Sequence, residues 1–335
     1  MQTMPIPGTE LRPSRIGLGT WAIGGWMWGG SDERESVRTI HAALDAGITL
    51  IDTAPAYGFG RAEEIVGKAL AESSWRDDAV LATKVGIEWS GAQPIRNAGR
   101  ARVLQEVEDS LRRLRTDRID IYQVHWPDPS VPIEETADAM ARLYESGKIR
   151  AIGVSNYSTE QIAQFAMAAP LHGVQSPYNL FERGIEHDVL PYCRDNGIAM
   201  LAYGSLCRGL LTGKMREDTT FEGDDLRQAD PKFHSPRYAQ YLEAVERLDE
   251  FARENFDRNV LELAVRWVLD QPGVTAALWG ARRPDQLEPV DRVMGWSLGA
   301  SARIAIEGIV EETVHDPIGP EFMAPPAREQ TADQS

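Results

Sequence analysis

The chain has 335 residues, of which 42% are hydrophobic, and its formal net charge is −16. An electrostatic field of this sign repels polyphosphate backbones, so the charge argues against nucleic acid as a partner. The length exceeds that of most single domains, but one large barrel with insertions can account for it as a single unit.

Three features predict a cytoplasmic protein without a membrane anchor. The two cysteines, Cys193 and Cys207, are too few for a disulfide framework and suit a reducing compartment. The N-terminus, MQTMPIPGTELRP, has no basic segment before an apolar run, so we expect no signal peptide. No apolar run reaches the roughly 18 residues that a spanning helix needs.

Short apolar runs alternate with amphipathic segments along the chain, which is typical of strands followed by helices. Residues 1–16, broken by prolines and Gly8, predict a small hairpin that caps one end of the sheet. Strands are predicted over residues 15–19, 49–52, 80–84, 120–125, 151–155, 174–176, 198–203 and 274–279. Helices are predicted over 32–46, 62–72, 100–114, 133–146, 186–196, 241–254 and 260–270, with others beginning at Ser158 and near Pro284. Asp32 with Glu35, and Ser158 with Gln161, are spaced as capping boxes.

Eight strand-to-helix steps predict an α/β fold with a parallel sheet. A closed (β/α)8 TIM barrel is favoured over an open sheet, because candidate chemical groups recur at many strand ends rather than at one switch point. We expect a single domain with a core at about residues 15–312, and a long insertion at 209–238 on the top face. In the tail, 313–335, residues 328–335 are expected to be disordered, and Phe322–Met323 to be a possible lid over the pocket.

Four ionisable side chains stand at or just after the ends of three consecutive predicted strands. Asp52 ends one strand and Tyr57 follows it in a loop, while Lys84 and His125 end the next two. These strand ends meet at one face of a barrel, so the four side chains should converge. Carbonyl reduction needs a proton donor, and tyrosine, which titrates near 10, is a weak acid at neutral pH unless a cation lowers its pKa. We expect Lys84 to lower the pKa of Tyr57 and Asp52 to hold Lys84 in place. His125 would donate a hydrogen bond to the substrate carbonyl.

Each of the four also has a purely structural interpretation, such as an end-of-strand lysine or a core histidine. The joint pattern GxxLIDTAxxYG, ATK and QxHWPD favours the functional one. With these motifs the sequence resembles the aldo-keto reductase superfamily, whose catalytic tetrad is Asp, Tyr, Lys and His at these places. The resemblance runs from about Ile16 to Leu287. The phrases GTWAIGGWMWGG, DLRQADPKF, ALWGAR and FMAPPAR look most like a bacterial subgroup of NADPH-dependent reductases of glyceraldehyde and other small aldehydes.

Further residues predict a binding site for a nicotinamide cofactor. A G-x-G-x-x-A string at residues 17–22 is set aside, because the Trp-rich loop that follows is not expected to be a helix. Ser155, Asn156 and Gln175 carry groups that suit a carboxamide, and Tyr203 can stack on a flat ring.

Two later segments suit phosphate groups. In GSLCRGLLTGK, backbone N–H groups are accompanied by Arg208 and Lys214, which are either pyrophosphate ligands or solvated surface bases. In GARRPDQ, two arginines stand at a predicted helix N-terminus, which is a good site for an additional phosphate.

The family resemblance implies a cofactor bound across the barrel mouth without a Rossmann domain. Arg282 would meet the adenosine 2′-phosphate and Gln286 the adenine, so NADPH is expected, with NADH as a weaker alternative. Many members follow this glutamine with Glu-Asn, where this chain has Pro289-Val290. The implied contact set comprises Trp21, Ser155, Asn156, Gln175, Tyr203, Gly204, Ser205, Leu206, Arg208, Gly209, Lys214, Arg227, Gly280, Arg282 and Gln286.

The expected function is NADPH-dependent reduction of small aldehydes or ketones, including glyceraldehyde-like and sugar-like carbonyls. One alternative is a regulatory subunit that binds the cofactor to sense redox state, which the intact tetrad disfavours. Another is an aldose dehydrogenase that works in the oxidative direction. A metal-dependent hydrolase is set aside and no metal is expected, because His125 has no HxH partner. Trp21, Trp26, Trp28, Trp89 and Trp126 lie on predicted top-face loops, where they form an apolar wall around the substrate or simply pack the loops.

Overall fold

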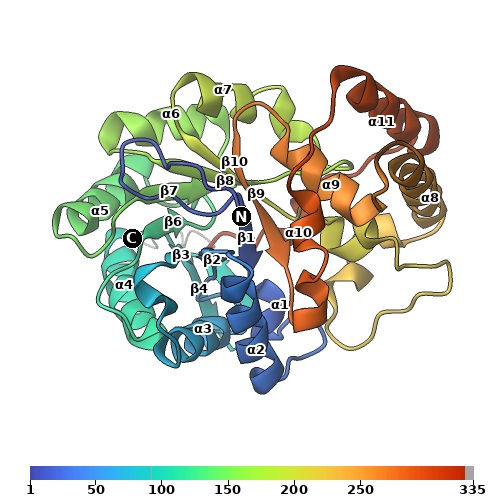
Figure 1. Ribbon diagram of the computed structural model, residues 1–335. Helices are drawn as coiled ribbons and strands as arrows, with labels where there is room; N and C mark the ends of the chain where they lie inside the picture. Colours follow the sequence, from blue (N-terminus) through green and yellow to red (C-terminus); the bar gives the residue numbers. More distant parts are fainter. Residues whose placement is uncertain (92, 329–335) are drawn as a thin grey trace.

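A closed barrel of parallel strands forms the centre of the structure, a computed structural model that describes residues 1–91 and 93–328 (Figure 1). The strand order around the barrel is β1-β10-β9-β8-β7-β6-β3-β2. The strands are β1 (Ile16–Gly19), β2 (Leu50–Asp52), β3 (Val80–Val85), β6 (Ile121–Val124), β7 (Ile152–Ser155), β8 (Gly173–Pro177), β9 (Ala199–Tyr203) and β10 (Val274–Gly280). Nearly all their residues are buried, which explains why the strands are almost continuous apolar runs in the sequence. The predicted fold class is confirmed.

Helices pack around the outside of this barrel (Figure 1). They are α2 (Glu33–Asp45), α3 (Arg61–Ala71), α4 (Arg100–Leu114), α5 (Ile133–Glu145), α6 (Thr159–Ala168), α7 (Val189–Asp195), α8 (Arg237–Phe256) and α9 (Val260–Leu269). The capping box of Ser158 and Gln161 is formed, as predicted. At α2 only half of the predicted box is present: Asp32 accepts from the Glu35 N–H at 2.8 Å, but the Glu35 carboxylate pairs with Arg38 instead of returning to the cap.

The predicted N-terminal hairpin is present and closes the floor of the barrel. Thr3 and Ser14 form an antiparallel bridge, and the Ile6 N–H donates to the carbonyl of Leu11 at 2.9 Å. Ile6 and Leu11 belong to one buried cluster with strand residues that point into the barrel, among them Leu50. The opposite end of the barrel is therefore the open one.

Two segments near the open end differ from the prediction. The loop at residues 20–30 contains one helical turn, α1 (Trp21–Gly24), because the N–H groups of Ile23 and Gly24 both donate to the Thr20 carbonyl. A small antiparallel hairpin, β4 (Ile87–Ser90) with β5 (Gln93–Arg96), was not expected. Gly91 and Pro94 interrupt its sequence and are typical of loops.

The helix expected to begin near Pro284 is not formed as one regular helix. That position begins one 3₁₀ turn, Pro284–Leu287, followed by the four-residue α10 (Val290–Val293). Pro289 and Gly295, the latter with φ +84°, break the run, and the longer helix is α11 (Ala300–Thr313). The helix dipole near Arg282 is therefore much weaker than the prediction assumed.

Residues 315–328, here called the C-terminal strap, cross the open end of the barrel. Arg96 fixes the strap twice, since its Nε donates to the Pro325 carbonyl at 2.7 Å and its backbone N–H to the Pro326 carbonyl at 3.0 Å. Further along, Arg328 pairs with Asp128 at 3.2 Å. The expected disorder of Arg328 is therefore wrong, whereas residues 329–335 lie outside the described residues. No helix of the described residues is long and apolar enough to cross a membrane.

Candidate active site

The four predicted catalytic side chains meet at the open end of the barrel. Lys84 lies in β3, and its Nζ donates to Asp52 Oδ1 at 2.6 Å, to the Thr53 carbonyl at 3.0 Å and to the Tyr57 hydroxyl at 3.3 Å. The His125 ring stands edge-on to the Tyr57 ring with centroids 5.7 Å apart. The predicted convergence of these four side chains is therefore confirmed.

The charges of this cluster differ from the expected arrangement. Burial and the Asp52 carboxylate hold the pKa of Tyr57 well above its usual value of 10. Any lowering of this pKa by Lys84 is outweighed here by burial and by Asp52, which pairs with the ammonium at 2.6 Å. Burial also lowers the pKa of Lys84, while Asp52 opposes that shift. Tyr57 is consequently a protonated donor held next to a neutral ion pair.

His125 is uncharged at neutral pH in this environment. Burial and the Lys84 ammonium both lower the pKa of His125 well below its usual range. A neutral imidazole still has one ring N–H and can donate a hydrogen bond.

Glutamine side chains hold the second carboxylate oxygen of Asp52. The Nε2 groups of Gln175 and Gln123 donate to Asp52 Oδ2 at 2.8 and 3.3 Å. Gln175 was predicted to bind a carboxamide, and its amide is partly committed to Asp52 here. Gln123 was missed, although a polar residue inside the buried apolar run IYQV is a usable signal.

Ser155, Asn156 and Tyr203 form the next part of the site, beside Gln175. Parallel pairing of β7 with β8 sets Ser155 opposite Gln175 at the same sheet edge. Asn156 has φ +63°, which asparagine tolerates better than most residues. Its side chain donates to Ser155 Oγ and the His125 carbonyl and accepts from the Tyr203 hydroxyl at 2.9 Å. These predicted cofactor residues are thus brought together.

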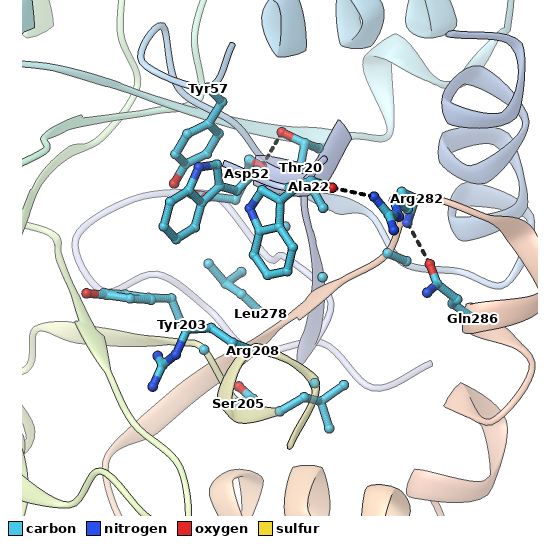
Figure 2. A pocket seen from close by; sticks show the side chains of 18 of the residues that line it. Thr20, Ala22, Asp52, Tyr57, Tyr203, Ser205, Arg208, Leu278, Arg282 and Gln286 are labelled. Carbon is cyan, nitrogen blue, oxygen red and sulfur yellow. Dashed lines mark hydrogen bonds between the residues drawn. The ribbon is translucent and has the colours of Figure 1, made fainter. Parts of the chain in front are cut away.

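Two cavities open from the catalytic cluster in different directions, and both are lined by Tyr57. The first runs past Tyr203 and Ser205 to Arg282 and Gln286, as Figure 2 shows with Tyr57 at one end and Arg282 at the other. The second lies under the C-terminal strap and is lined by aromatic side chains. We refer to them as the long cavity and the strap cavity.

The far end of the long cavity is cationic. Arg282 donates to the Trp28 carbonyl at 2.8 Å and has no carboxylate partner within the described residues. Burial, together with the charges of Arg227 and Arg283, lowers the pKa of Arg282. Arg227, which also lines this cavity, pairs with Asp225 and lies over the Trp28 ring. An anion placed here would relieve repulsion between neighbouring guanidinium groups.

The backbone N–H groups expected to be free at this end are already bonded. Gln286 Oε1 accepts from the N–H groups of Arg282 and Arg283 at 2.9 and 3.2 Å. Gln286 therefore caps this turn in the structure. Arg283 is exposed and pairs with Asp285.

In the structure, Arg208 has neither of the two roles considered from the sequence, a pyrophosphate ligand or a solvated surface base. It is buried in an ionic cluster with Glu182, Asp230 and Lys232, where its Nε donates to Asp230 at 2.6 Å. Lys232 in turn donates to the Gly319 carbonyl of the C-terminal strap. The guanidinium is thus neither solvated nor free for a pyrophosphate. Lys214 is exposed and does not line the long cavity.

The ionic cluster fixes an unusual backbone beside the long cavity. Cys207 and Arg208 both have positive φ, 45° and 54°, which non-glycine residues rarely adopt. Gly204 and Gly209, at φ +67° and +91°, flank them, and Ser205 lies between. This loop lines the cavity with small residues and backbone, as the sequence suggested.

The roof of the long cavity joins two loops that are distant in sequence. Asp224 accepts from the N–H groups of Met27 and Gly29 at 2.7 and 3.1 Å, and the Leu226 N–H donates to the Met27 carbonyl. Trp21 stacks on Tyr57 with centroids 5.8 Å apart. The indole N–H groups of Trp21 and Trp28 are buried without a partner in the described structure.

A barrel whose open end carries Asp, Tyr, Lys and His between two cavities defines an enzyme class, and the comparisons agree with it. Residues 15–306 match the family model described as "Aldo/keto reductase family", and the chain belongs to this family of oxidoreductases.

Three proteins show where the chain lies within the family. It is 61% identical to the aldo-keto reductase YhdN of Bacillus subtilis (strain 168), over 98% of this chain and 100% of the relative. It is 36% identical to the NADH-specific methylglyoxal reductase of Escherichia coli (strain K12), over 86% and 91% of the two chains. The solved glycerol dehydrogenase AKR11B4 from Gluconobacter oxydans is 53% identical with a TM-score of 0.88, covering 96% of this chain and 99% of that one.

Proposed function

We propose that the protein reduces small aldehydes and ketones to alcohols with NADPH, and that Tyr57 is the general acid. The observation that carries this proposal is the junction of two cavities at the Tyr57 hydroxyl, 3.3 Å from Lys84 Nζ. One cavity has cationic groups at its far end, and the other is apolar away from the Tyr57 hydroxyl. This arrangement suits a dinucleotide and a carbonyl compound that meet at a proton donor.

Two observations favour a nicotinamide cofactor in the long cavity. The buried indole N–H groups of Trp21 and Trp28 lack acceptors, and Arg282 lacks an acidic partner among the described residues. A ligand with many acceptor oxygens would satisfy such groups. NADPH, when bound, supplies the hydride. Ser155, Asn156, Gln175 and Tyr203 would hold its nicotinamide end, the loop at 204–209 its pyrophosphate, and Arg282 with Arg227 its adenosine phosphate.

The protein's own groups would act on the carbonyl oxygen. Tyr57, kept protonated by burial and by Asp52, gives its proton to the developing alkoxide. Lys84 holds the hydroxyl in position, and neutral His125 donates a second hydrogen bond to the same oxygen. Its ring faces the strap cavity next to Tyr57.

The choice of NADPH over NADH rests on Arg282. Enzymes of this family use a nicotinamide cofactor, and the name of the Escherichia coli relative specifies NADH. Arg282 lies near Arg227 and Arg283, and Asp225, the carboxylate whose charge acts on Arg282, is itself paired with Arg227. This surplus of positive charge favours the cofactor with the additional phosphate. The two cysteines are buried free thiols, which fits the cytoplasmic location that we propose.

The oxidative direction is a second candidate. The solved relative is titled a glycerol dehydrogenase, and the same proton donor becomes a base when an alcohol is oxidised. The ratio of the forward and reverse rates would decide between the two directions.

Steady-state oxidation of NADPH and NADH with a panel of aldehydes tests the proposal. Tyr57→Phe should lower kcat by about 10²-fold or more, the scale of a lost general acid, while NADPH still binds. Binding is measured separately by titration, so that a folding defect is recognised. Near wild-type kcat in this variant, with chemistry rate-limiting, would refute the assignment of Tyr57.

A further inference from the structure

One glutamine points into the barrel beside the catalytic cluster. Gln123 lies in β6, and its side chain is fully buried. Its neighbours Tyr122 and Val124 share a core cluster with helix residues, whereas Ile121 belongs to the cluster inside the barrel. Side chains alternate between the two faces of a strand, so Gln123 shares the inner face with Ile121. An amide buried there costs free energy unless it is hydrogen-bonded.

Gln123, Gln175 and Asp52 form a closed triangle of hydrogen bonds. The Nε2 groups of both glutamines donate to Asp52 Oδ2, and Gln175 Nε2 also donates to Gln123 Oε1 at 3.3 Å. An amide nitrogen carries two hydrogens, so those of Gln175 are both used inside the triangle. The carbonyl oxygen of the Gln175 amide is the atom that remains, and it has no hydrogen-bond partner in the described chain.

The backbone next to Gln123 leaves room for this arrangement. Parallel pairing sets Gln123 opposite Lys84 on one side and Gly153 on the other. A Cβ atom at residue 153 would stand 2.8 Å from Gln123 Cγ, well inside the optimal carbon–carbon separation of about 3.5–4.0 Å. Glycine at this position therefore allows Gln123 to keep the conformation that closes the triangle.

We infer that Gln123 is a positioning residue, which fixes the Gln175 amide with its oxygen turned toward the carboxamide of the nicotinamide cofactor. The inference rests on the proposed function and deepens it. Gln175 lines both the long cavity and the strap cavity, whereas Gln123 lines neither and would act through Gln175. A carboxamide presents an NH2 group that needs an acceptor, and a Gln175 amide turned the other way would present a second donor.

A competing explanation is that Gln123 only supports the ion pair of Asp52 and Lys84, because Gln123 also donates to Asp52. The two explanations differ in what the cofactor would feel. A residue that supports the ion pair, or that only fills space, would affect all pyridine nucleotides alike. A residue that aims the Gln175 oxygen would affect only nucleotides whose ring carries an NH2 donor.

NADP+ and its 3-acetylpyridine analogue make this distinction, because the analogue has a methyl group in place of the carboxamide NH2. Their Kd values are measured by titrating the tryptophan fluorescence of the wild type, Gln175→Met and Gln123→Met. The ratio of the analogue Kd to the NADP+ Kd should be roughly two- to tenfold greater in the wild type than in Gln175→Met, the scale of one neutral hydrogen bond. Gln123→Met should lose most of that excess.

Two further variants separate this effect from a folding defect. Gly153→Ala keeps all three polar side chains but displaces Gln123, so it should lower the ratio in the same direction. Ile121→Leu is the matched control, since it reshapes a buried side chain on the same inner face of β6 and should keep the wild-type ratio. Denaturant titration shows whether each variant is folded.

The outcomes distinguish the inference from the proposed function. A wild-type ratio in folded Gln123→Met refutes the inference, and if that variant does not fold, a wild-type ratio in Gly153→Ala refutes it. An equal rise of both Kd values would also refute it and assign Gln123 to the ion pair. In each of these cases, reduction of aldehydes with NADPH would leave the proposed function intact. If the wild type neither binds NADP+ nor reduces any aldehyde, the proposed function fails, and the inference fails with it.

Discussion

Replacing Arg282 by alanine should change the choice of cofactor rather than the chemistry. The guanidinium donates to the carbonyls of Trp28 and Gly30 and has no acidic partner in the described structure. A charge-assisted hydrogen bond to a phosphate is worth about 1.5–3 kcal/mol. Arg282 is partly exposed, and solvent screening favours the lower part of that range. At about 1.4 kcal/mol per decade, the lower part of the range corresponds to a rise in KM for NADPH of roughly ten- to thirtyfold.

The assay compares KM for NADPH and NADH at saturating aldehyde in three variants. In Arg282→Ala, KM for NADH should barely move, because NADH has no phosphate to lose. Arg282→Gln keeps a hydrogen-bond donor for the Trp28 carbonyl but removes the charge. It therefore distinguishes the effect of a loosened loop at Trp28 from the effect of losing the ion pair with the phosphate. Arg283→Ala is the matched control, since Arg283 is exposed and paired with Asp285.

A parallel rise of both KM values in Arg282→Ala would refute the reasoning. It would show that the side chain supports the loop at Trp28 and does not recognise a phosphate. An equal effect of Arg283→Ala would move the phosphate site to the exposed side of this turn.

Three other perturbations test separate parts of the site. Lys84→Met should abolish most activity. By leaving Asp52 buried and unpaired, it should also lower the free energy of unfolding, measured by denaturant titration, by about 3–5 kcal/mol. Adding Asp52→Asn should restore part of that stability, and additive losses in the double variant would contradict an ion pair between Lys84 and Asp52. Arg96→Ala should release the C-terminal strap and raise KM for the aldehyde several-fold with little change in NADPH affinity, whereas equal changes in both would show that Arg96 acts on the whole fold. Because burial lowers the pKa of both His125 and His172, the unfolded state binds more protons, and the unfolding free energy should fall as the pH drops from 7 through about 6.5. His125→Gln should flatten that slope, and a slope unchanged in the variant would argue against a neutral His125.

The catalytic cluster could be predicted because its geometry is set by the strands. Asp52, Lys84 and His125 stand at or next to strand ends, and parallel strands bring such ends to one face regardless of what the loops do. Tyr57 follows Asp52 by only five positions, so its place was nearly fixed as well.

The contacts within the cofactor loops could not be predicted from the sequence in the same way, because their charged side chains pair with residues that are distant in the sequence. Arg208 bonds to Asp230 and Glu182, 22 and 26 residues away, and nothing local to Arg208 indicates either partner. Gln286 was assigned to an adenine from the family resemblance, whereas in the structure it caps its own turn. The pKa of Tyr57 is raised by burial and by the nearby Asp52 carboxylate, and spacing in the sequence gives neither the burial nor the distance.

The bond from Arg96 to the Pro325 carbonyl has a consequence for how the molecule folds. It joins groups 229 residues apart, and the strap cannot be fixed until the barrel between them exists. The strap is held on the barrel rim by a few hydrogen bonds at the surface, and segments held in this way open before the strands of the core. The substrate-side wall should therefore be among the last parts of the enzyme to assemble during folding. In native-state hydrogen exchange, the backbone amides of residues 321–328 should exchange well before those of β3 and β6. Proteolysis there would then open the strap cavity while the barrel remains folded.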